Sequence, residues 1–381
     1  MNKHPICLLV TPVTTDETIS IRLYTDNVAR ILRQHNIHVD VLRGRNIFYP
    51  RVLSKIFEVV LRYIYYPLFI VFSPASVIHI TDHAYSFLEL ITRVTGKKCI
   101  ISLHSRPEDI LSDRMWKKLN HQVYFPRLTK LLFTFSMRQL PKADHIICIS
   151  PSIYTSLLRS GVSKKKLHMI PPPISDVYFR RLTKREQRLV RDKVMAKRNR
   201  FFILHVGRND PADKNIEHVI RCVSTLHNRD FPVRFIKVGE PFTADQNRLI
   251  TNLNIREFIS HLGILSQSEL RLVYRYCDVL LFPSYFEGCP APPFEALASG
   301  LPVILSDIPA HKDFFKRYAL FTDPDDYRTS AALIQRLHHF PDLTRERLRL
   351  GRIAALNMRW KTMSEKLLTV YSDSNSETSR P

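Results

Sequence analysis

The sequence predicts an α/β protein built from two doubly wound parallel sheets. Short apolar runs rich in β-branched residues alternate with helical patterns, which is typical of strand–helix–strand units in a sheet buried on both faces. The alternation stops near residues 175–183 and then starts again, and a chain of 381 residues is long enough for two cores. We therefore expect domains at residues 1–178 and 179–355, then a last helix at 356–372 and a disordered tail at 373–381.

The first half begins with an apolar run at residues 6–12, an amphipathic helical pattern and a second apolar run at 38–44. Further runs before the break lie at residues 76–82, 98–105, 145–151 and 167–173. The runs are short and mostly uninterrupted by polar residues, so each one predicts a strand buried on both faces.

The second half repeats this pattern. Its apolar runs lie at residues 201–208, 233–240, 258–264, 278–284 and 302–307. Four of the nine glycines are expected at the ends of these strands, namely Gly207, Gly239, Gly263 and Gly288. Glycine there permits a sharp turn or the close approach of a ligand, and ligands of open α/β sheets bind beyond the carboxyl ends of the strands. The glycines therefore favour a ligand cradle, with ordinary tight turns as the alternative.

The chain is strongly basic, with 57 Lys and Arg residues against 35 Asp and Glu residues and a formal net charge of +22. Residues 1–180 carry 25 basic and 12 acidic residues, so the excess is larger in the first half. A field of this sign attracts nucleic acid, an anionic membrane surface or phosphorylated small molecules. Because no helix-turn-helix, zinc or RNA-binding signature is present, we expect no nucleic-acid partner.

The six cysteines form no CxxC pair and no zinc-ligand spacing. Cys7, Cys99 and Cys148 lie in short apolar runs, where a cysteine is commonly a small buried hydrophobe. We therefore expect no disulfide and no cysteine-bound metal, and this usage favours a reducing, cytoplasmic compartment.

Two cations lie near the end of the first strand expected in the second half. Arg208 follows Gly207, and Lys214 comes just before a good helical pattern. Cations at the mouth of a sheet beside a helix N-terminus form an anion site, in which arginine grips a phosphate bidentately and lysine acts as a point charge. The alternative for this segment alone is a pair of solvated cations in a very basic protein.

Two acids lie in the stretch SYFEGCPAPPFEALASG. Glu287 follows the strand expected at 278–284, and Glu295 is expected in the first turn of a short helix that a proline begins and Gly300 ends. Both carboxylates would then face the sheet edge that carries the two cations, where carboxylates are good acceptors for the hydroxyls of a sugar or ribose. A capping role for Glu295 is the alternative.

Together these segments resemble a retaining family 4 glycosyltransferase, one of the glycosyl transferases of group 1 with the GT-B fold. HVGRNDPADKN is similar to the family's G-R-x5-K-N segment, and FPSYFEGCPAPPFEALASGLPVILSD is similar to its E-x7-E segment. ADHIICISPSI and KKLHMIPPPISDVYF resemble the exit from its first domain, and MRWKTMSEKLLTVY resembles its final helix, which crosses back to that domain. The resemblance covers residues 140–372 well and the first 140 residues in outline.

The resemblance implies two Rossmann-like domains facing across a cleft, the first binding the acceptor and the second a nucleotide sugar. It implies metal-independent, cofactor-free sugar transfer, with retention of configuration, to a cell-surface glycan or glycolipid. Arg208 and Lys214 would neutralise the diphosphate, Glu287 would contact the donor sugar, and Glu295 would hold the ribose hydroxyls. The donor-binding set would comprise Gly207, Arg208, Lys214, Asn215, Gly239, Gly263, Glu287, Gly288, Ala291 and Glu295.

In the first domain, His104 ends the run at 98–105 and matches the family's histidine that meets the donor sugar. It completes the expected catalytic set with Arg208, Lys214 and Glu287. Asp82, which ends the run at 76–82, or His83, which follows it, is a weaker first-domain candidate.

The sequence departs from the family pattern in two places. The loop after the first strand lacks the usual glycines and carries Asp16 and Glu17, which are unwelcome near a diphosphate. The E-x7-E segment contains three residues without an N–H, namely Pro290, Pro292 and Pro293. Backbone contacts would therefore pass mainly through Ala291. These departures keep a catalytically silent GT-B protein that binds a nucleotide or glycan as an alternative, beside a GT-B epimerase or phosphorylase.

Two stretches of the first half mix bases with aromatic and aliphatic residues: RVLSKIFEVVLRYIYYPLFIVF and RMWKKLNHQVYFPRLTKLLFTFSMRQL. Such stretches can lie in a headgroup layer with apolar side chains dipped in. Packing of the same side chains onto the sheet is the alternative, because every doubly wound fold needs such helices. Given the base excess, an anionic membrane surface is a candidate partner, with the protein peripheral on the cytoplasmic face.

Overall fold

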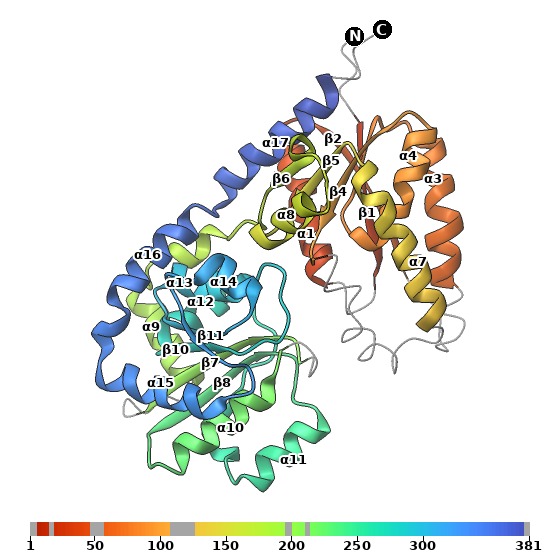
Figure 1. Ribbon diagram of the computed structural model, residues 1–381. Coiled ribbons are helices and arrows are strands. Elements are labelled where there is room, and N and C mark those ends of the chain that lie inside the picture. Colours follow the sequence, from red (N-terminus) through yellow and green to blue (C-terminus); the bar gives the residue numbers. More distant parts are fainter. Residues whose placement is uncertain are drawn as a thin grey trace. The chain divides into compact units, whose positions relative to one another are not determined.

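The structure is a computed structural model that describes residues 6–14, 19–45, 57–106, 126–194, 200–209 and 214–376. The chain forms two compact units, Met1–Pro172 with Met363–Pro381, and Pro173–Thr362 (Figure 1). Each unit contains one six-stranded sheet, and the strands described in both sheets pair in parallel. The predicted α/β class with two parallel sheets is therefore confirmed.

The first sheet has the strand order β2-β1-β3-β4-β5-β6. Its strands are β1 (Ile6–Thr14), β2 (His38–Arg45), β3 (Val77–Ile80), β4 (Lys98–Leu103), β5 (His145–Cys148) and β6 (Leu167–Met169). Each strand lies within or overlaps an apolar run predicted from the sequence. Strands β2 and β3 pair on opposite sides of β1, so the strand order reverses at β1. In open α/β sheets, ligands bind beyond the carboxyl ends of the strands at such a reversal, here those of β1 and β3.

Helices join the strands of the first sheet. They are α1 (Ile19–Gln34), η2 (Leu61–Tyr65), α3 (Tyr66–Phe72), η3 (His83–Leu88), α4 (Glu89–Val94), α7 (Pro126–Gln139), η4 (Leu140–Lys142), α8 (Pro151–Arg159) and η5 (Lys164–Lys166). Local chemistry fixes where several of them begin. In α8, for example, Ser150 is the N-cap, its side chain accepts from the Ile153 N–H, and Pro151 occupies the first turn, where no N–H is needed.

The second sheet has the strand order β12-β11-β10-β7-β8-β9. Its strands are β7 (Phe201–Gly207), β8 (Val233–Gly239), β9 (Ile259–His261), β10 (Val279–Phe282), β11 (Val303–Ser306) and β12 (Leu320–Thr322). The predicted strands are all present, and β12 is an additional edge strand that the sequence analysis missed.

The helices of the second unit are η6 (Asp176–Phe179), α9 (Lys184–Val194), α10 (Ile216–His227), α11 (Ala244–Asn252), η7 (Arg256–Phe258), α12 (Gln267–Tyr276), α13 (Ala291–Ser299), α14 (Pro309–Phe315), α15 (Tyr327–His339), η8 (Pro341–Thr344) and α16 (Arg345–Leu356). Reciprocal side-chain and backbone hydrogen bonds fix two of the helix starts. They pair Thr243 with Gln246 at α11, and Ser266 with Glu269 at α12.

The second sheet is buried on both faces. Ile203 and Leu204 are neighbours on β7, and both are fully buried, yet they belong to different hydrophobic clusters. Successive side chains of a strand point to opposite faces, so these clusters are the two layers of the core. This explains why the strands read as continuous apolar runs.

The last helix, α17 (Trp360–Ser376), begins in the second unit and continues in the first. It extends past residue 372, so residues 373–376, predicted as part of a disordered tail, are helical. The remaining tail residues, 377–381, lie outside the described part of the chain. Cys7, Cys99 and Cys148 are free and buried, as predicted.

Candidate donor and acceptor sites

Two glycines meet at the carboxyl edge of the second sheet. Gly207 ends β7 and pairs in register with Gly239 at the end of β8. Gly239 has a φ of 115°, and a Cβ atom on it would lie 2.1 Å from the Gly207 carbonyl oxygen. Its N–H donates to the Gly263 carbonyl at 2.8 Å. The backbones therefore approach so closely at this edge that no side chain fits at residue 239, and all three expected glycines gather there.

Lys214 and Asn215 connect this edge to helix α10. Asn215 has a left-handed φ of 51° and precedes the helix directly. Its buried side-chain amide donates to the carbonyls of Pro283 and Pro324, at 3.1 and 2.7 Å. The resemblance implies that Asn215 binds the donor, but in this structure its side-chain N–H groups bond to backbone carbonyls and stabilise the loop. That loop holds Lys214 beside the helix N-terminus.

Lys214 forms an ion pair with Glu287. Its Nζ atom lies 2.5 Å from Glu287 Oε1, and the two side chains are only 16% and 10% exposed. The ammonium also lies 5.5 Å from the centroid of the Phe282 ring on β10. The structure therefore brings together one expected cation and one expected carboxylate. Arg208 directly follows β7, next to Gly207, at the same sheet edge.

His311, on α14, lies near Lys214 and Glu287, and the sequence analysis did not indicate it. It is fully buried, and its Nδ1 atom lies 2.9 Å from the Ser306 carbonyl oxygen. Burial lowers the pKa of His311 to about 4, although the nearby Glu287 carboxylate opposes this shift. The imidazole is therefore neutral, and because a carbonyl only accepts, Nδ1 carries the proton. Nε2 is then a buried acceptor without a hydrogen-bond partner among the described residues.

Glu295 lies in a different setting from Glu287. The Tyr274 hydroxyl, on α12, donates to Glu295 Oε2 at 2.9 Å. Burial raises the pKa of Glu295 to about 7, while hydrogen bonds from Tyr274 and Tyr178 oppose the rise. Both tyrosines are almost fully buried, and their rings meet edge to face at 5.8 Å. The carboxyl group is therefore held by two tyrosines that no local sequence pattern indicated.

The prediction that Glu295 lies in the first turn of its helix is wrong. Helix α13 begins at Ala291, so Glu295 falls in the second turn, and the first turn contains no acid. The helix starts earlier than predicted because prolines are compatible with its first turn, where N–H groups have no intrahelical partner. Pro290 is the N-cap residue and gives no side-chain cap, whereas Gly300 ends the helix with a φ of 82°, as predicted. Glu295 is thus not a cap either. Gly288 lies in a bend just before this helix.

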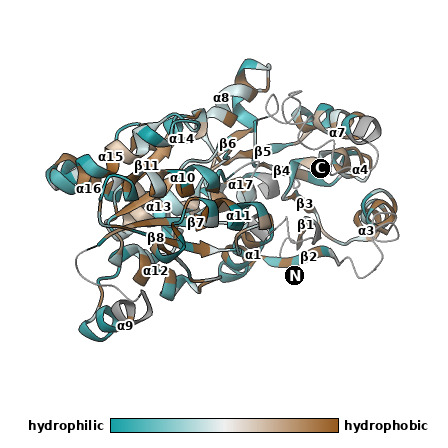
Figure 2. Ribbon diagram, turned by 90° about the horizontal axis from the view of Figure 1, so that it is seen from below, coloured by the Kyte–Doolittle hydropathy of each residue, from teal (hydrophilic) through white to brown (hydrophobic). Residues whose placement is uncertain are grey.

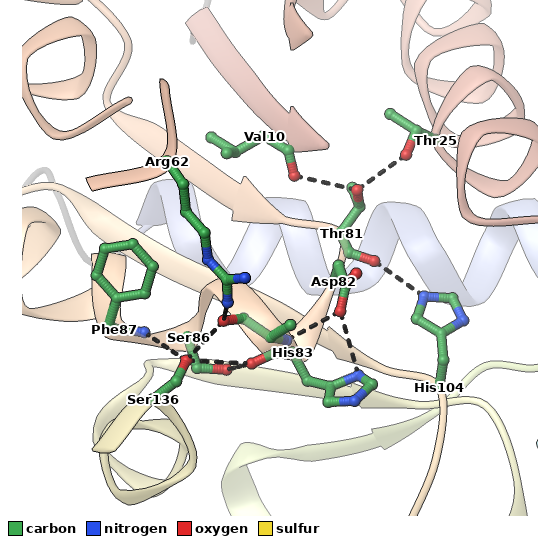
Figure 3. Close-up of polar contacts among 11 residues, drawn as sticks. Val10, Thr25, Arg62, Thr81, Asp82, His83, Ser86, Phe87, His104 and Ser136 are labelled. Carbon is green, nitrogen blue, oxygen red and sulfur yellow. Dashed lines mark hydrogen bonds and ion pairs between the residues drawn. The ribbon is translucent and has the colours of Figure 1, made fainter. Parts of the chain in front are cut away.

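In the first unit, His104 follows β4 and is half-buried. Its Nε2 atom lies 2.9 Å from the Thr81 carbonyl oxygen, so Nε2 carries the proton and Nδ1 is an acceptor (Figure 3). The Tyr24 ring meets the imidazole edge to face at 4.9 Å. Burial lowers the pKa of His104 to about 4, with Asp82 opposing the shift. His104 is therefore a neutral, oriented imidazole at neutral pH.

The weaker candidates Asp82 and His83 lie close to His104 (Figure 3). Asp82 caps helix η3, because its Oδ1 atom accepts from the Ala84 N–H at 2.9 Å. The same atom lies 3.5 Å from His83 Nδ1. Burial lowers the pKa of His83, and Asp82 opposes the shift. The structure thus gathers all three expected residues of the first unit at the carboxyl ends of β3 and β4.

Other expectations fall outside the described residues or concern metals and membranes. Asp16 and Glu17 belong to the part of the chain that is not described. Within the described ranges, no set of three or more His, Cys, Asp or Glu side chains is arranged to hold a metal ion. In the same ranges, no helix has the length and apolar content needed to cross a bilayer.

Two family models match adjacent parts of the chain. The model described as Glycosyltransferase Family 4 matches residues 19–177, and the model described as Glycosyl transferases group 1 matches residues 186–354. The second region contains the whole second sheet, and the first contains every strand of the first sheet except β1. The chain belongs to glycosyltransferase family 4. Its fold is therefore GT-B, as predicted.

Sequence relatives agree with membership of glycosyltransferase family 4, and a solved structure agrees with the fold. The O-antigen chain mannosyltransferase RfbU of Salmonella typhimurium is 22% identical over 68% of this chain and 71% of its own length. The MMP alpha-(1->4)-mannosyltransferase of Mycolicibacterium hassiacum is 27% identical over 70% of this chain, but the match spans only 62% of that relative. The HepE protein of Anabaena, solved with UDP, superposes with a TM-score of 0.73 at 15% identity, covering 97% of this chain and 100% of that one.

Proposed function

We propose that this family 4 protein transfers a sugar from a nucleotide-diphosphate donor to a glycan or glycolipid acceptor of the cell surface, with retention of configuration. The observation that carries the proposal is the Lys214–Glu287 ion pair at the glycine-lined edge of the second sheet. Lys214, a cation suited to bind phosphate, is hydrogen-bonded there to Glu287, a carboxylate suited to accept sugar hydroxyls. The names of the relatives, both mannosyltransferases, support a hexosyl donor.

The diphosphate would bind at the N-terminus of α10, with Lys214 and Arg208 as its cations. Charge builds up on the diphosphate as the bond to the sugar breaks, and preorganised cations stabilise that charge. Lys214 would exchange its contact with Glu287 for one with a phosphate oxygen. The Glu287 carboxylate would then accept a hydroxyl group of the donor sugar. We propose that the reaction needs no bound metal, because the two side chains can supply the positive charge.

Glu295 would accept the ribose hydroxyls, with Tyr274 and Tyr178 holding the carboxyl group in place. Gly207, Gly239 and Gly263 would let the nucleotide approach the backbone closely, and Gly288 and Ala291 would supply N–H groups next to the prolines. HepE binds UDP, which supports a nucleotide on a fold of this kind.

We assign the first unit to the acceptor side of the reaction. The neutral His104 offers Nδ1 as an acceptor for a sugar hydroxyl, and Asp82 and His83 would hold the acceptor or orient His104. We place this reaction in the cytoplasm, at an anionic membrane surface. The base excess of the first 180 residues and the O-antigen acceptor named for RfbU support that location.

One observation favours a second candidate, a catalytically silent protein that binds a nucleotide or glycan. Pro290 is the N-cap of α13, and Pro292 lies in its first turn, so this helix offers fewer N–H groups to a phosphate than a proline-free start would. Binding without turnover would follow if the lost donors were needed in the transition state.

The test is a panel of UDP- and GDP-sugars, scored for a rise in melting temperature and for slow donor hydrolysis. We expect one donor to stabilise the wild type and to be hydrolysed, and Arg208→Ala and Lys214→Ala to abolish both effects. Arg221→Ala, on the exposed side of α10, is the matched control and should behave as the wild type. Stabilisation without hydrolysis or transfer would favour the silent protein. A full response from both site variants would refute the donor-site assignment.

A further inference from the structure

The helical segment at residues 57–72, which includes η2 and α3, has an exposed apolar side. We call that side the outward face. Its members are between 39% and 82% exposed, and they are Val59, Ile64, Tyr65, Leu68, Phe69 and Phe72. Soluble monomers rarely expose so many large apolar side chains next to one another, and such a patch commonly marks an interaction surface.

The helix is anchored by its opposite side. Tyr66 and Ile70, four residues apart, are fully buried. The Tyr66 hydroxyl donates to the Thr11 carbonyl at 3.0 Å and accepts from the Gly44 N–H at 2.8 Å, which ties the helix to β1 and β2. Packing on the sheet therefore accounts for Tyr66 and Ile70. It does not account for Leu68 and Phe72, which are 52% and 82% exposed.

The named members of the outward face are all uncharged, and the two charged residues of the segment, Glu58 and Arg62, are only partly exposed. Arg62 turns inward, where its guanidinium donates to the Ala84 carbonyl and lies 4.4 Å from the Tyr85 ring centroid. Helix α4 lies beside α3 (Figure 1), and it ends in another exposed apolar residue, Val94, which is 80% exposed. Figure 2 shows the ribbon of α3 mostly in the colour of hydrophobic residues.

Basic residues are frequent around this segment in the sequence. Arg51 and Lys55 precede it there but lie outside the described residues. At its other end, the Lys97 ammonium donates to the carbonyls of Ser73 and Ala75, just beyond Phe72. An exposed apolar helix face in a half of the chain with 25 basic and 12 acidic residues fits the boundary between acyl chains and anionic headgroups. A second copy of the chain would bring two such base excesses together, so charge disfavours that occupant.

We propose that the outward face docks on an anionic bilayer, with Leu68 and Phe72 dipped below the headgroups and the segment lying along the surface. The inference rests on the proposed function, because a glycolipid acceptor would lie in the same surface. It goes further in naming the helix that binds the membrane and the side chains that enter the lipid.

The test is cosedimentation of the full chain with vesicles of phosphatidylcholine, alone or with added phosphatidylglycerol. We expect binding only to the anionic vesicles, and a fall of about tenfold in the partition coefficient for the double variant Leu68→Ser with Phe72→Ser. Ile264→Ser is the matched control, because Ile264 is also 82% exposed but lies in the other unit. In a second measurement, Phe72→Trp should be quenched by brominated acyl chains, and Ile264→Trp should not.

Equal vesicle binding of the wild type and the double variant would overturn the proposal, and so would an absence of quenching at residue 72. A wild-type dimer that the double variant converts to a monomer, without lipid binding, would assign the face to a second copy instead. Nucleotide-induced stabilisation is measured on the same variants. Vesicle binding that depends on the outward face, in a protein that no nucleotide sugar stabilises, would refute the proposed function while the docking surface stands.

Discussion

Lys214 Nζ lies 2.5 Å from Glu287 Oε1, although 73 positions separate the two residues in the sequence. Both side chains are largely buried, so each neutralises a charge that would otherwise be costly at this sheet edge. A diphosphate that approaches Lys214 therefore competes with a carboxylate already in place. The two residues should consequently respond in opposite ways to substitution.

Glu287→Gln should raise the affinity for UDP or GDP, because it removes the competing carboxylate and leaves Lys214 charged. We expect a gain of about fivefold, equivalent to about 1 kcal/mol. Lys214→Met removes the cation and leaves Glu287 unpaired, so affinity should fall about 100-fold. Isothermal titration calorimetry with each nucleotide measures both changes.

The exposed pair of Lys312 and Asp307, in the same unit, supplies the control. Its atoms lie 2.6 Å apart, but the side chains are 51% and 45% exposed. Asp307→Asn should therefore change nucleotide affinity and stability little, since exposed ion pairs contribute less than about 1 kcal/mol. Weaker nucleotide binding by Glu287→Gln would contradict the competition between Glu287 and the diphosphate.

The pKa of Glu295, raised by burial to about 7, predicts that nucleotide binding depends on pH. Only the carboxylate form accepts hydrogen bonds from both ribose hydroxyls. We expect UDP or GDP affinity to rise about tenfold from about pH 6 to about pH 8, as the carboxyl group ionises. Glu295→Gln should remove this part of the profile and leave only the titration of the nucleotide's own phosphate. An unchanged profile in that variant would show that Glu295 does not hold the ribose.

The raised pKa of Glu295 also predicts that the protein becomes less stable as the pH rises, whereas nucleotide binding becomes stronger. A carboxyl group whose pKa is higher in the folded protein binds more protons there than in the unfolded chain. Its contribution to the free energy of unfolding is present below the ordinary value of 4.5 and is lost as the pH rises through about 7. Melting temperatures of the wild type should therefore fall over this range relative to those of Glu295→Gln. A constant difference between the two proteins would refute this prediction.

Gly239→Ala should disrupt the donor edge of the second sheet. The added Cβ atom would lie 2.1 Å from the Gly207 carbonyl oxygen, so the ends of β7 and β8 must separate. We expect a loss of at least about 3 kcal/mol in the free energy of unfolding, together with loss of nucleotide binding. Gly263→Ala is the matched control. Gly263 also has a positive φ, of 70°, but no atom lies within 4 Å of its added Cβ, so the cost should be about 1 kcal/mol.

Much of the fold was readable from the sequence because its strands are buried on both faces. A strand with one face in water alternates apolar and polar residues, so a continuous apolar run such as the one around Ile203 and Leu204 indicates a strand buried on both faces. Strand β12 was missed because only three residues, Leu320–Thr322, form it, and Asp323 follows at once. The start of α13 was predicted too late because Pro292 and Pro293, which lie in its first turn, are typical of loops as well as of helix starts.

The residues of the candidate site that lie next to strand ends could be predicted from the sequence. Parallel strands bring their carboxyl ends to one edge, which is why Lys214 and Glu287 could be placed together from the sequence. The surroundings of Glu295 could not be inferred in this way. Tyr274 and Tyr178 come from α12 and η6, and only the packing of these elements against α13 brings their hydroxyls to one carboxyl group. The raised pKa of Glu295 therefore could not be predicted from the sequence.

The anchoring of α17 in the first unit depends on a buried hydrogen bond. The Tyr371 hydroxyl lies 2.5 Å from His79 Nδ1, and His79 Nε2 lies 2.8 Å from the Ser102 hydroxyl oxygen. Both rings are buried, so Tyr371→Phe leaves an imidazole nitrogen without its partner. Stability should fall by about 1–3 kcal/mol, the usual cost of an unsatisfied buried polar group.

The loss should be concentrated in the helix. Amide hydrogen exchange of residues 363–376 should accelerate in Tyr371→Phe, while exchange in the second unit stays unchanged, because the lost contact lies within the first unit. Tyr65→Phe is the matched control, since Tyr65 is 44% exposed and its hydroxyl can bond to water. Unchanged exchange in α17 of the Tyr371 variant would show that apolar packing, with Leu367 and Val370 buried on the same helix, holds it without the hydrogen bond.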